Sequence, residues 1–298
     1  MSRQQREQLD QILRHGEFDI GGDVDEQRVI FHEMISSVPL ADDIVTTPGE
    51  LGGVPVITVE TPDNDPSVVV LYFHGGGYAL GSARDSVGLA ADVARRVGAR
   101  AITVDYRLAP EHRYPAAITD AVAAYQALLD SGVPNSRVAF VGESAGGGLV
   151  VATLVALKEA GLPQPSSAAV FSPFVDLTLS GESMKTKAEV DPALTLDGLR
   201  RRVGDYLAGG DPAVGTASPI FADLTGLPPL LIQAGSHEIL LDDATRLAAR
   251  AAAYDVPVQL QVWPEVPHVF QGFAALLDEG ATALDSAAAF TKAHWVTE

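Results

Sequence analysis

One short segment, Gly142–Gly147 (GESAGG), constrains the fold of this chain more than any other. Residues 138–141 form an apolar run typical of a buried strand, and residues 148–160 are small and apolar, as in a buried helix. A G-x-S-x-G sequence between strand and helix predicts a sharp turn that exposes Ser144 at the edge of a sheet. The helix N-terminus would place free backbone N–H groups beside that serine. By itself the motif is also consistent with a purely structural turn.

A second glycine-rich segment lies upstream. Residues 68–73 form a continuous apolar run, as expected of a buried parallel strand, and His74–Gly77 (HGGG) follows at once. Three consecutive glycines cost conformational entropy, so a loop that contains them needs a function. We interpret it as a loop whose backbone N–H groups face an anion. A merely flexible turn is the alternative, which the position after a core strand disfavours.

Runs of β-type and helical pattern alternate along the chain. Strands are predicted near residues 43–47, 54–60, 68–73, 100–105, 138–142, 168–172, 230–235 and 258–263, and helices near 86–97, 115–130, 147–160, 242–254 and 280–293. This alternation predicts an α/β fold with an eight-stranded, mostly parallel sheet flanked by helices. Residues 1–40 and 196–207 have helical spacing and lie outside the alternation.

These motifs resemble those of bacterial members of the hormone-sensitive-lipase family of α/β-hydrolases. His74–Gly77 and Gly142–Gly147 resemble two of the family's motifs, and Asp105–Glu111 (DYRLAPE) resembles a third. The similarity runs from about residue 40 to the C-terminus. Glu143 stands where the family usually has Asp, and we expect it to tune packing near the turn. The resemblance implies one α/β-hydrolase domain over residues 1–298, with a small helical cap formed by about 1–40 and 180–212.

A serine nucleophile needs a base, and the chain has seven histidines. In this fold the residues follow the order serine, acid, histidine, which leaves His237, His268 and His294 as bases. His268 follows the predicted strand 258–263 on a proline-rich loop, where side chains meet above the sheet. His294 lies near the chain end, and His237 precedes the acid candidate. We therefore predict His268.

The acid should follow the strand before the base. The family usually has an acid, then Leu two positions later and a second acid after that. Glu238 fits this register, with Leu240 and Asp242 behind it, so the resemblance favours Glu238. Asp242 and Asp243 fit better in the first turn of a helix, where acids favour the helix dipole. Asp176 is a further alternative on an earlier loop.

The remaining candidate site residues are amides and apolar side chains. The backbone N–H groups of Gly76, Gly77 and Ala145 are predicted to form an oxyanion hole. Candidates for lining a substrate pocket are Tyr78, Phe31, Met34, Leu199 and Val203. Packing in the core is an equally good interpretation of these five, since apolar helix faces usually form the core. Arg107, Glu111 and His74 are expected to brace structure.

The predicted function is that of a serine carboxylesterase that hydrolyses short-to-medium acyl esters through an acyl-enzyme. A lactonase or amidase with the same triad, or a non-catalytic ligand-binding member of the fold, are alternatives. No metal-ligand spacing is found, so no metal or cofactor is predicted.

The charge and composition of the chain limit the kinds of partner that it is expected to bind. With 20 basic and 39 acidic residues, the net charge of −19 opposes binding to nucleic acid or anionic membranes. The polar N-terminus and the lack of a long apolar run predict a cytoplasmic protein without stable membrane association. The alternating segment 258–263 is expected to be a sheet edge and to support a homodimer.

Overall fold

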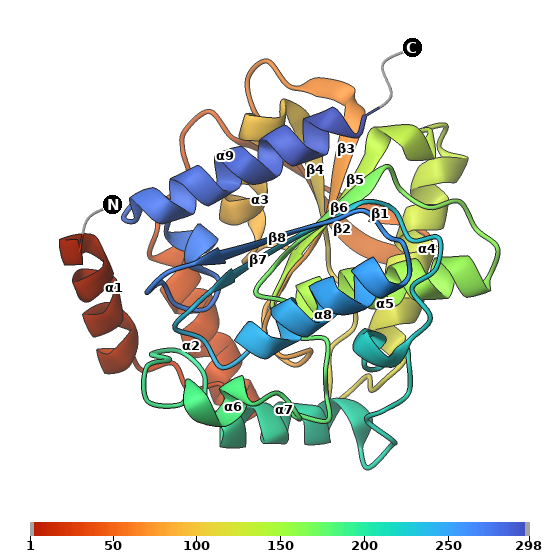
Figure 1. The fold of residues 1–298 in the computed structure, drawn as a ribbon. Helices are drawn as coiled ribbons and strands as arrows, with labels where there is room; N and C mark the ends of the chain where they lie inside the picture. Colours follow the sequence, from red (N-terminus) through yellow and green to blue (C-terminus); the bar gives the residue numbers. More distant parts are fainter. Residues whose placement is uncertain (1–2, 296–298) are drawn as a thin grey trace.

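The computed structural model describes residues 3–295, and its centre is a single eight-stranded sheet (Figure 1). The strands are β1 (Val45–Leu51), β2 (Val54–Glu60), β3 (Asp65–Phe73), β4 (Ala99–Val104), β5 (Val138–Glu143), β6 (Ser167–Phe171), β7 (Leu230–Gly235) and β8 (Val258–Trp263). They are arranged in the order β1-β2-β4-β3-β5-β6-β7-β8. The strands from β3 to β8 run parallel, and β2 is antiparallel to both of its neighbours. The predicted fold class is therefore confirmed.

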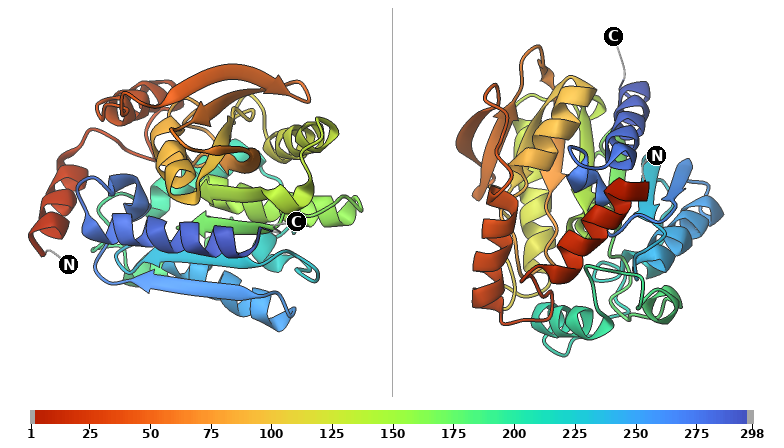
Figure 2. Two further views of the ribbon diagram at one scale, coloured as in Figure 1. Left: turned by 90° about the horizontal axis from the view of Figure 1, so that it is seen from above. Right: turned by 90° about the vertical axis from the view of Figure 1, so that its left-hand side faces the viewer.

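Helices cover both faces of the sheet (Figures 1 and 2). They are α1 (Arg3–His15), α2 (Val24–Ser36), α3 (Val87–Val97), α4 (Ala116–Asp130), α5 (Ala145–Glu159), α6 (Ser183–Thr186), α7 (Leu196–Leu207), α8 (Leu241–Ala253) and α9 (Asp278–Ala293), with short 3-10 helices at Asn135–Arg137, Pro219–Phe221 and Phe270–Phe273. Helices α3 and α9 pack on one face, and α4, α5 and α8 pack on the other.

The buried part of the central strand β3, residues 68–73, shows why this run is apolar throughout. Val69, Leu71 and Phe73 belong to the core beneath α4, α5 and α8, whereas Val70 and Tyr72 belong to the core beneath α3 and α9. A strand buried on both faces has no polar side, so its sequence is a continuous apolar run without alternating polar residues. The strand fixes the position of the glycine loop that follows it.

The first predicted strand is displaced from its predicted position. It was expected near residues 43–47 and lies at Val45–Leu51, paired antiparallel with β2 from Val45 opposite Glu60 to Leu51 opposite Val54. Gly52 and Gly53 both have positive φ angles, 59° and 81°, and form the turn. The hairpin turn sets the end of β1, because a tight turn requires the strand to continue to its partner's first residue.

Strand β8 is an edge strand, as predicted, but it does not bury its apolar side chains as the alternating sequence predicted. It lies at the opposite edge of the sheet from β1 (Figure 2). Leu260 and Val262 are 39% and 43% exposed. The outer backbone groups of β8 pair with no other strand within residues 3–295.

The N-terminal helices and the segment around α6 and α7 lie together at one end of the molecule (Figure 1). Arg201 Nη1 donates to the carbonyl of Gly21 at 2.8 Å, and Arg202 Nη2 donates to that of Gly22 at 3.0 Å. Arg14 Nη2 donates to the carbonyl of Val190 at 3.1 Å. These contacts join residues before the sheet to residues inserted between β6 and β7.

None of the helices within residues 3–295 has both the length and the apolar composition needed to cross a membrane. The cytoplasmic location stays a prediction.

Candidate active site

Ser144 occupies a strained turn between β5 and α5. Its φ and ψ angles of 54° and −122° lie in a region that residues with a Cβ rarely adopt. Its N–H donates to the carbonyl of Phe171 at 2.9 Å, and its carbonyl accepts from the N–H of Phe174 at 2.9 Å. A Cβ on Gly146 would lie 2.0 Å from the carbonyl oxygen of Phe73, so only glycine fits there. Neighbouring strands therefore hold the strained serine in place.

The glycine loop lies directly beside this turn. A Cβ on Gly75 would lie 3.1 Å from the Cβ of Ser144. Gly76 and Gly77 have φ angles of 108° and 62°, and a Cβ on Gly76 would lie 2.3 Å from the carbonyl oxygen of Leu80. Among the described residues, the N–H groups of Gly76 and Gly77 have no hydrogen-bond partner. The N–H of Ala145, at the N-terminus of α5, lies next to the serine in the chain.

His74 holds this loop and is not placed as a base. Its Nδ1 donates to the carbonyl of Gly75 at 2.8 Å, and its own carbonyl accepts from the Tyr106 hydroxyl at 2.7 Å. Its ring stacks on that of Tyr106 with centroids 4.2 Å apart. Burial lowers the pKa of His74, which favours the neutral ring. The predicted bracing role is confirmed.

Glu238 and His268 are in direct contact. His268 Nδ1 donates to Glu238 Oε2 at 2.7 Å; Glu238 is fully buried, and the imidazole is 8% exposed. Glu238 Oε1 accepts from the N–H of Gly235 at 2.7 Å and from the hydroxyl of Ser172 at 3.0 Å. Burial raises the pKa of Glu238, and the hydrogen bond from His268 opposes that rise. With Nδ1 engaged, Nε2 is the nitrogen left to exchange a proton with a substrate or nucleophile.

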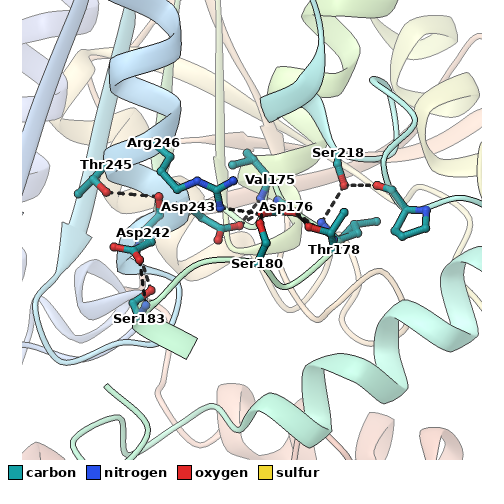
Figure 3. Close-up of polar contacts among 12 residues, drawn as sticks. Val175, Asp176, Thr178, Ser180, Ser183, Ser218, Asp242, Asp243, Thr245 and Arg246 are labelled. Atoms are coloured by element: carbon teal, nitrogen blue, oxygen red, sulfur yellow. Dashed lines mark hydrogen bonds and ion pairs between the residues drawn. The ribbon is translucent and has the colours of Figure 1, made fainter. Parts of the chain in front are cut away.

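The three alternative acids, Asp176, Asp242 and Asp243, make polar contacts of their own (Figure 3). Asp242 Oδ2 accepts from the N–H of Ser183 at 2.9 Å, and Asp176 Oδ2 pairs with Arg246 Nη1 at 2.7 Å. Asp243 Oδ2 accepts from the N–H of Asp176 at 2.9 Å, and burial raises the pKa of Asp243 well above its ordinary value. In the part of the chain that the structure describes, none of the three is hydrogen-bonded to the imidazole that Glu238 holds.

Neither of the two alternative histidines takes part in this pair. His294 ends α9, and its Nδ1 donates to the carbonyl of Phe290 at 2.8 Å. The N–H of His237 donates to the carbonyl of Val266 at 3.1 Å. Neither side chain is hydrogen-bonded to a carboxylate of residues 3–295.

Known proteins with similar sequences and structures identify the family. The family model described as alpha/beta hydrolase fold matches residues 70–272. The acetyl-hydrolase of Streptomyces hygroscopicus is 44% identical over 247 residues, which cover 82% of this chain and 83% of that protein. The esterase of Acinetobacter venetianus is 39% identical over 226 residues, 74% of each chain. The crystal structure of an esterase from the bacterial hormone-sensitive-lipase family has a TM-score of 0.96 at 40% identity, covering 99% of this chain and 100% of that one.

The chain belongs to the hormone-sensitive-lipase family of α/β-hydrolases. This family member is a carboxylic ester hydrolase, since relatives that match 74–82% of the chain are esterases and acetyl-hydrolases, and the similar crystal structure over 99% of it is that of an esterase.

At Glu143 this hormone-sensitive-lipase family member has a longer acid than the expected Asp. Glu143 Oε1 accepts from the N–H of Gly75 at 2.8 Å, and Oε2 accepts from the hydroxyl of Tyr72 at 2.5 Å. Glu143 therefore links the serine turn to the glycine loop, a more specific role than the packing effect expected from the sequence. Burial raises the pKa of Glu143 from 4.5 to about 7, although both hydrogen bonds favour the ionised form.

Replacing Glu143 with glutamine is expected to change how stability depends on pH. A carboxyl whose pKa is raised on folding stabilises the fold below its unfolded pKa, and loses that contribution as pH rises through its folded pKa. Relative to Glu143→Gln, the wild type should lose about 2–3 kcal/mol of unfolding free energy between pH 4.5 and 7.5. Urea titrations of both proteins across this range measure the difference. The exposed Glu159→Gln variant serves as control, and parallel pH profiles for wild type and Glu143→Gln would contradict the expectation.

The five predicted pocket residues differ in exposure. Tyr78 and Leu199 are each 2% exposed and belong to the main core, where the Tyr78 ring stacks on Tyr206 at 4.1 Å. Phe31, Met34 and Val203 remain partly exposed. Core packing is thus the observed environment of Tyr78 and Leu199, and the other three keep surface that a ligand could contact.

The two charged residues expected to brace structure do so. Arg107 Nη2 pairs with Asp120 Oδ1 at 2.7 Å, and Glu111 pairs with Arg28 at 2.7 Å. Arg28 also donates to the carbonyl of Ala79 at 2.9 Å, which connects α2 to the end of the glycine loop.

Three residues with contacts at this site were not singled out from the sequence: Ser172, Tyr72 and Asp191. Ser172 follows β6 at the carboxyl edge of the sheet, and this position was the available signal. In the sequence Tyr72 is one more residue of a predicted buried strand, and no neighbouring residue indicates a role for its hydroxyl.

Within residues 3–295 no three histidine, aspartate or glutamate side chains converge as metal ligands.

Proposed function

We propose that this ester hydrolase acts on short-to-medium acyl carboxylic esters through Ser144, His268 and Glu238. The observation that carries the proposal is the 2.7 Å hydrogen bond between His268 Nδ1 and the buried carboxylate of Glu238. A buried acid bonded to one imidazole nitrogen fixes the tautomer and stabilises the imidazolium, which is the role of the acid in serine hydrolases.

The proposed reaction has two steps. His268 Nε2 takes the proton of Ser144 as Oγ attacks the ester carbonyl, and the imidazolium then protonates the leaving alcohol. His268 next activates water, which hydrolyses the acyl-enzyme and frees the serine. Within the described chain the Ser144 hydroxyl has no hydrogen-bond partner, and such contacts often tighten only when substrate binds.

The oxyanion of both tetrahedral intermediates would accept hydrogen bonds from the N–H groups of Gly76, Gly77 and Ala145. The unpartnered amides of the glycine loop and the N-terminus of α5 support this assignment. Such donors are already oriented, so they stabilise developing charge without reorganisation.

We further propose that about residues 1–40 and 180–212 form a cap over this site. The hydrogen bonds of Arg201 and Arg202 to the Gly21–Gly22 turn support a joint unit. A Cβ on Gly77 would lie 2.7 Å from Cγ of Arg202, so α7 packs directly on the glycine loop. A compact cap limits the room for long acyl chains, which favours short-to-medium esters.

Hydrolysis of p-nitrophenyl esters from acetate to palmitate tests the proposed substrate range. We expect kcat/KM to be highest for the short chains. Labelling with phenylmethanesulfonyl fluoride should stop turnover and place the adduct on Ser144 by peptide mass spectrometry. An adduct elsewhere, or highest activity on palmitate, would contradict the proposal. Turnover of lactones or amides but not of simple esters would favour those alternatives, and a folded protein inert to all three classes would favour a binding role.

We also infer that the protein is a homodimer joined along β8. Leu260 and Val262 expose apolar surface on a strand whose outer backbone groups are unpaired, a combination that favours association. Light scattering at micromolar concentration should give the dimer mass for the wild type and the monomer mass for Val262→Lys. A monomeric wild type would overturn this inference.

A further inference from the structure

A carboxylate outside the proposed triad is buried next to it. Asp191 lies between α6 and α7 and is 6% exposed. Its Oδ1 accepts from the N–H groups of Ala193 and Leu194 at 2.8 and 2.9 Å, and its Oδ2 accepts from that of Ile239 at 2.8 Å. Three N–H donors compensate much of the cost of burying an acid.

The bond to Ile239 connects two distant parts of the chain. Ile239 directly follows Glu238, so Asp191 ties the inserted segment between β6 and β7 to the loop that carries the proposed catalytic acid. A shift of this loop would move the Glu238 carboxylate relative to His268, whose Nδ1 it holds at 2.7 Å.

Asp191 also interacts with His268 through its charge. Burial raises the pKa of Asp191, and the charge of His268 is the largest opposing influence, ahead of the three N–H groups. The negative charge of Asp191 in turn contributes to the raised pKa of Glu238. Three carboxylates interact with the charge of His268: Glu238 after β7, which also contacts the ring, Asp191 before α7, and Glu143 at the end of β5.

We propose that Asp191 is a positioning residue for ester hydrolysis, which holds the Glu238 loop in place and supplies a second negative charge that stabilises the His268 imidazolium. The inference rests on the proposed function, because it takes His268 as the base. Imidazolium forms in both steps of that reaction, so a fixed negative charge nearby would favour each transition state.

The pH profile of p-nitrophenyl butyrate hydrolysis by Asp191→Asn tests the inference. Without the negative charge the imidazolium is less stable, so the acidic limb of kcat/KM should move to lower pH. We expect kcat to fall roughly 10- to 100-fold from the displaced loop. Asp191→Glu, which restores the charge, should return the limb towards the wild-type position even if kcat recovers only in part.

Asp242→Asn is the matched control. Asp242 also ties α8 to the inserted segment, through the N–H of Ser183 at 2.9 Å, but within residues 3–295 its carboxylate is not hydrogen-bonded to Asp191, Glu238 or His268. Loosening this contact should leave the acidic limb unmoved. An unshifted limb in Asp191→Asn, or an equal shift in Asp242→Asn, would overturn the inference. If Asp191→Asn fails to fold, Asp191→Ser replaces it in the same comparison.

His268→Ala separates this inference from the proposed function. Activity that survives in His268→Ala would overturn the triad and the role of Asp191 together. Loss of activity in His268→Ala, combined with a wild-type profile in Asp191→Asn, would overturn the role of Asp191 alone.

Discussion

Ser144→Ala is expected to lower kcat for p-nitrophenyl butyrate by on the order of 10⁵- to 10⁶-fold, as in serine hydrolases that lose the nucleophile. Without Oγ no acyl-enzyme can form, and only the oxyanion donors and substrate binding would remain to assist attack by water. The strained backbone of residue 144 is held by contacts of its own N–H and carbonyl, so the variant should stay folded.

Turnover is measured at high enzyme concentration, with circular dichroism to verify the fold. Ser166→Ala is the matched control. Ser166 lies at the amino end of β6, away from the carboxyl ends of the strands where Ser144 lies, and its hydroxyl donates only to the carbonyl of Val138. Residual activity of Ser144→Ala within tenfold of the wild type would rule out Ser144 as the nucleophile.

Glu238→Gln is expected to lower kcat by roughly 10⁴-fold, the loss seen when the orienting acid of a triad becomes an amide. The Glu238 carboxylate accepts hydrogen bonds from Gly235, Ser172 and His268. An amide offers one acceptor oxygen in place of two, so the imidazole loses its fixed orientation or a buried donor is left unpaired. An unpaired buried donor would add about 1–3 kcal/mol of destabilisation.

Two variants sharpen this assignment. Glu238→Asp keeps the charge on a shorter side chain and should retain more activity than Glu238→Gln. Asp242→Asn should stay close to wild type, because Asp242 contacts Ser183 (Figure 3) and is not hydrogen-bonded to the imidazole within residues 3–295. Near-wild-type turnover by Glu238→Gln, with a large loss in Asp242→Asn, would transfer the role of the acid to Asp242.

The order and type of the elements, the serine turn and the glycine loop were all predictable from the sequence. Each depends on local information: run length for buried strands, helical spacing, and glycine where the backbone has positive φ or a Cβ would clash. Gly76 illustrates this, since its φ of 108° and the carbonyl oxygen of Leu80, four residues on, leave no room for a side chain. The end of β1 was not predictable in this way, because its partner strand sets it.

Only the tertiary structure decided which distant residues the buried carboxylates contact. The pairing of Glu238 with His268 spans 30 residues, and that of Glu143 with Gly75 spans 68. The sequence left Asp176, Asp242 and Asp243 as alternatives to Glu238, because acids near the ends of parallel strands look alike until the strands are placed side by side. Asp191 gave no signal at all, since its importance comes only from the N–H of Ile239 and the charge of His268, which the fold brings to it.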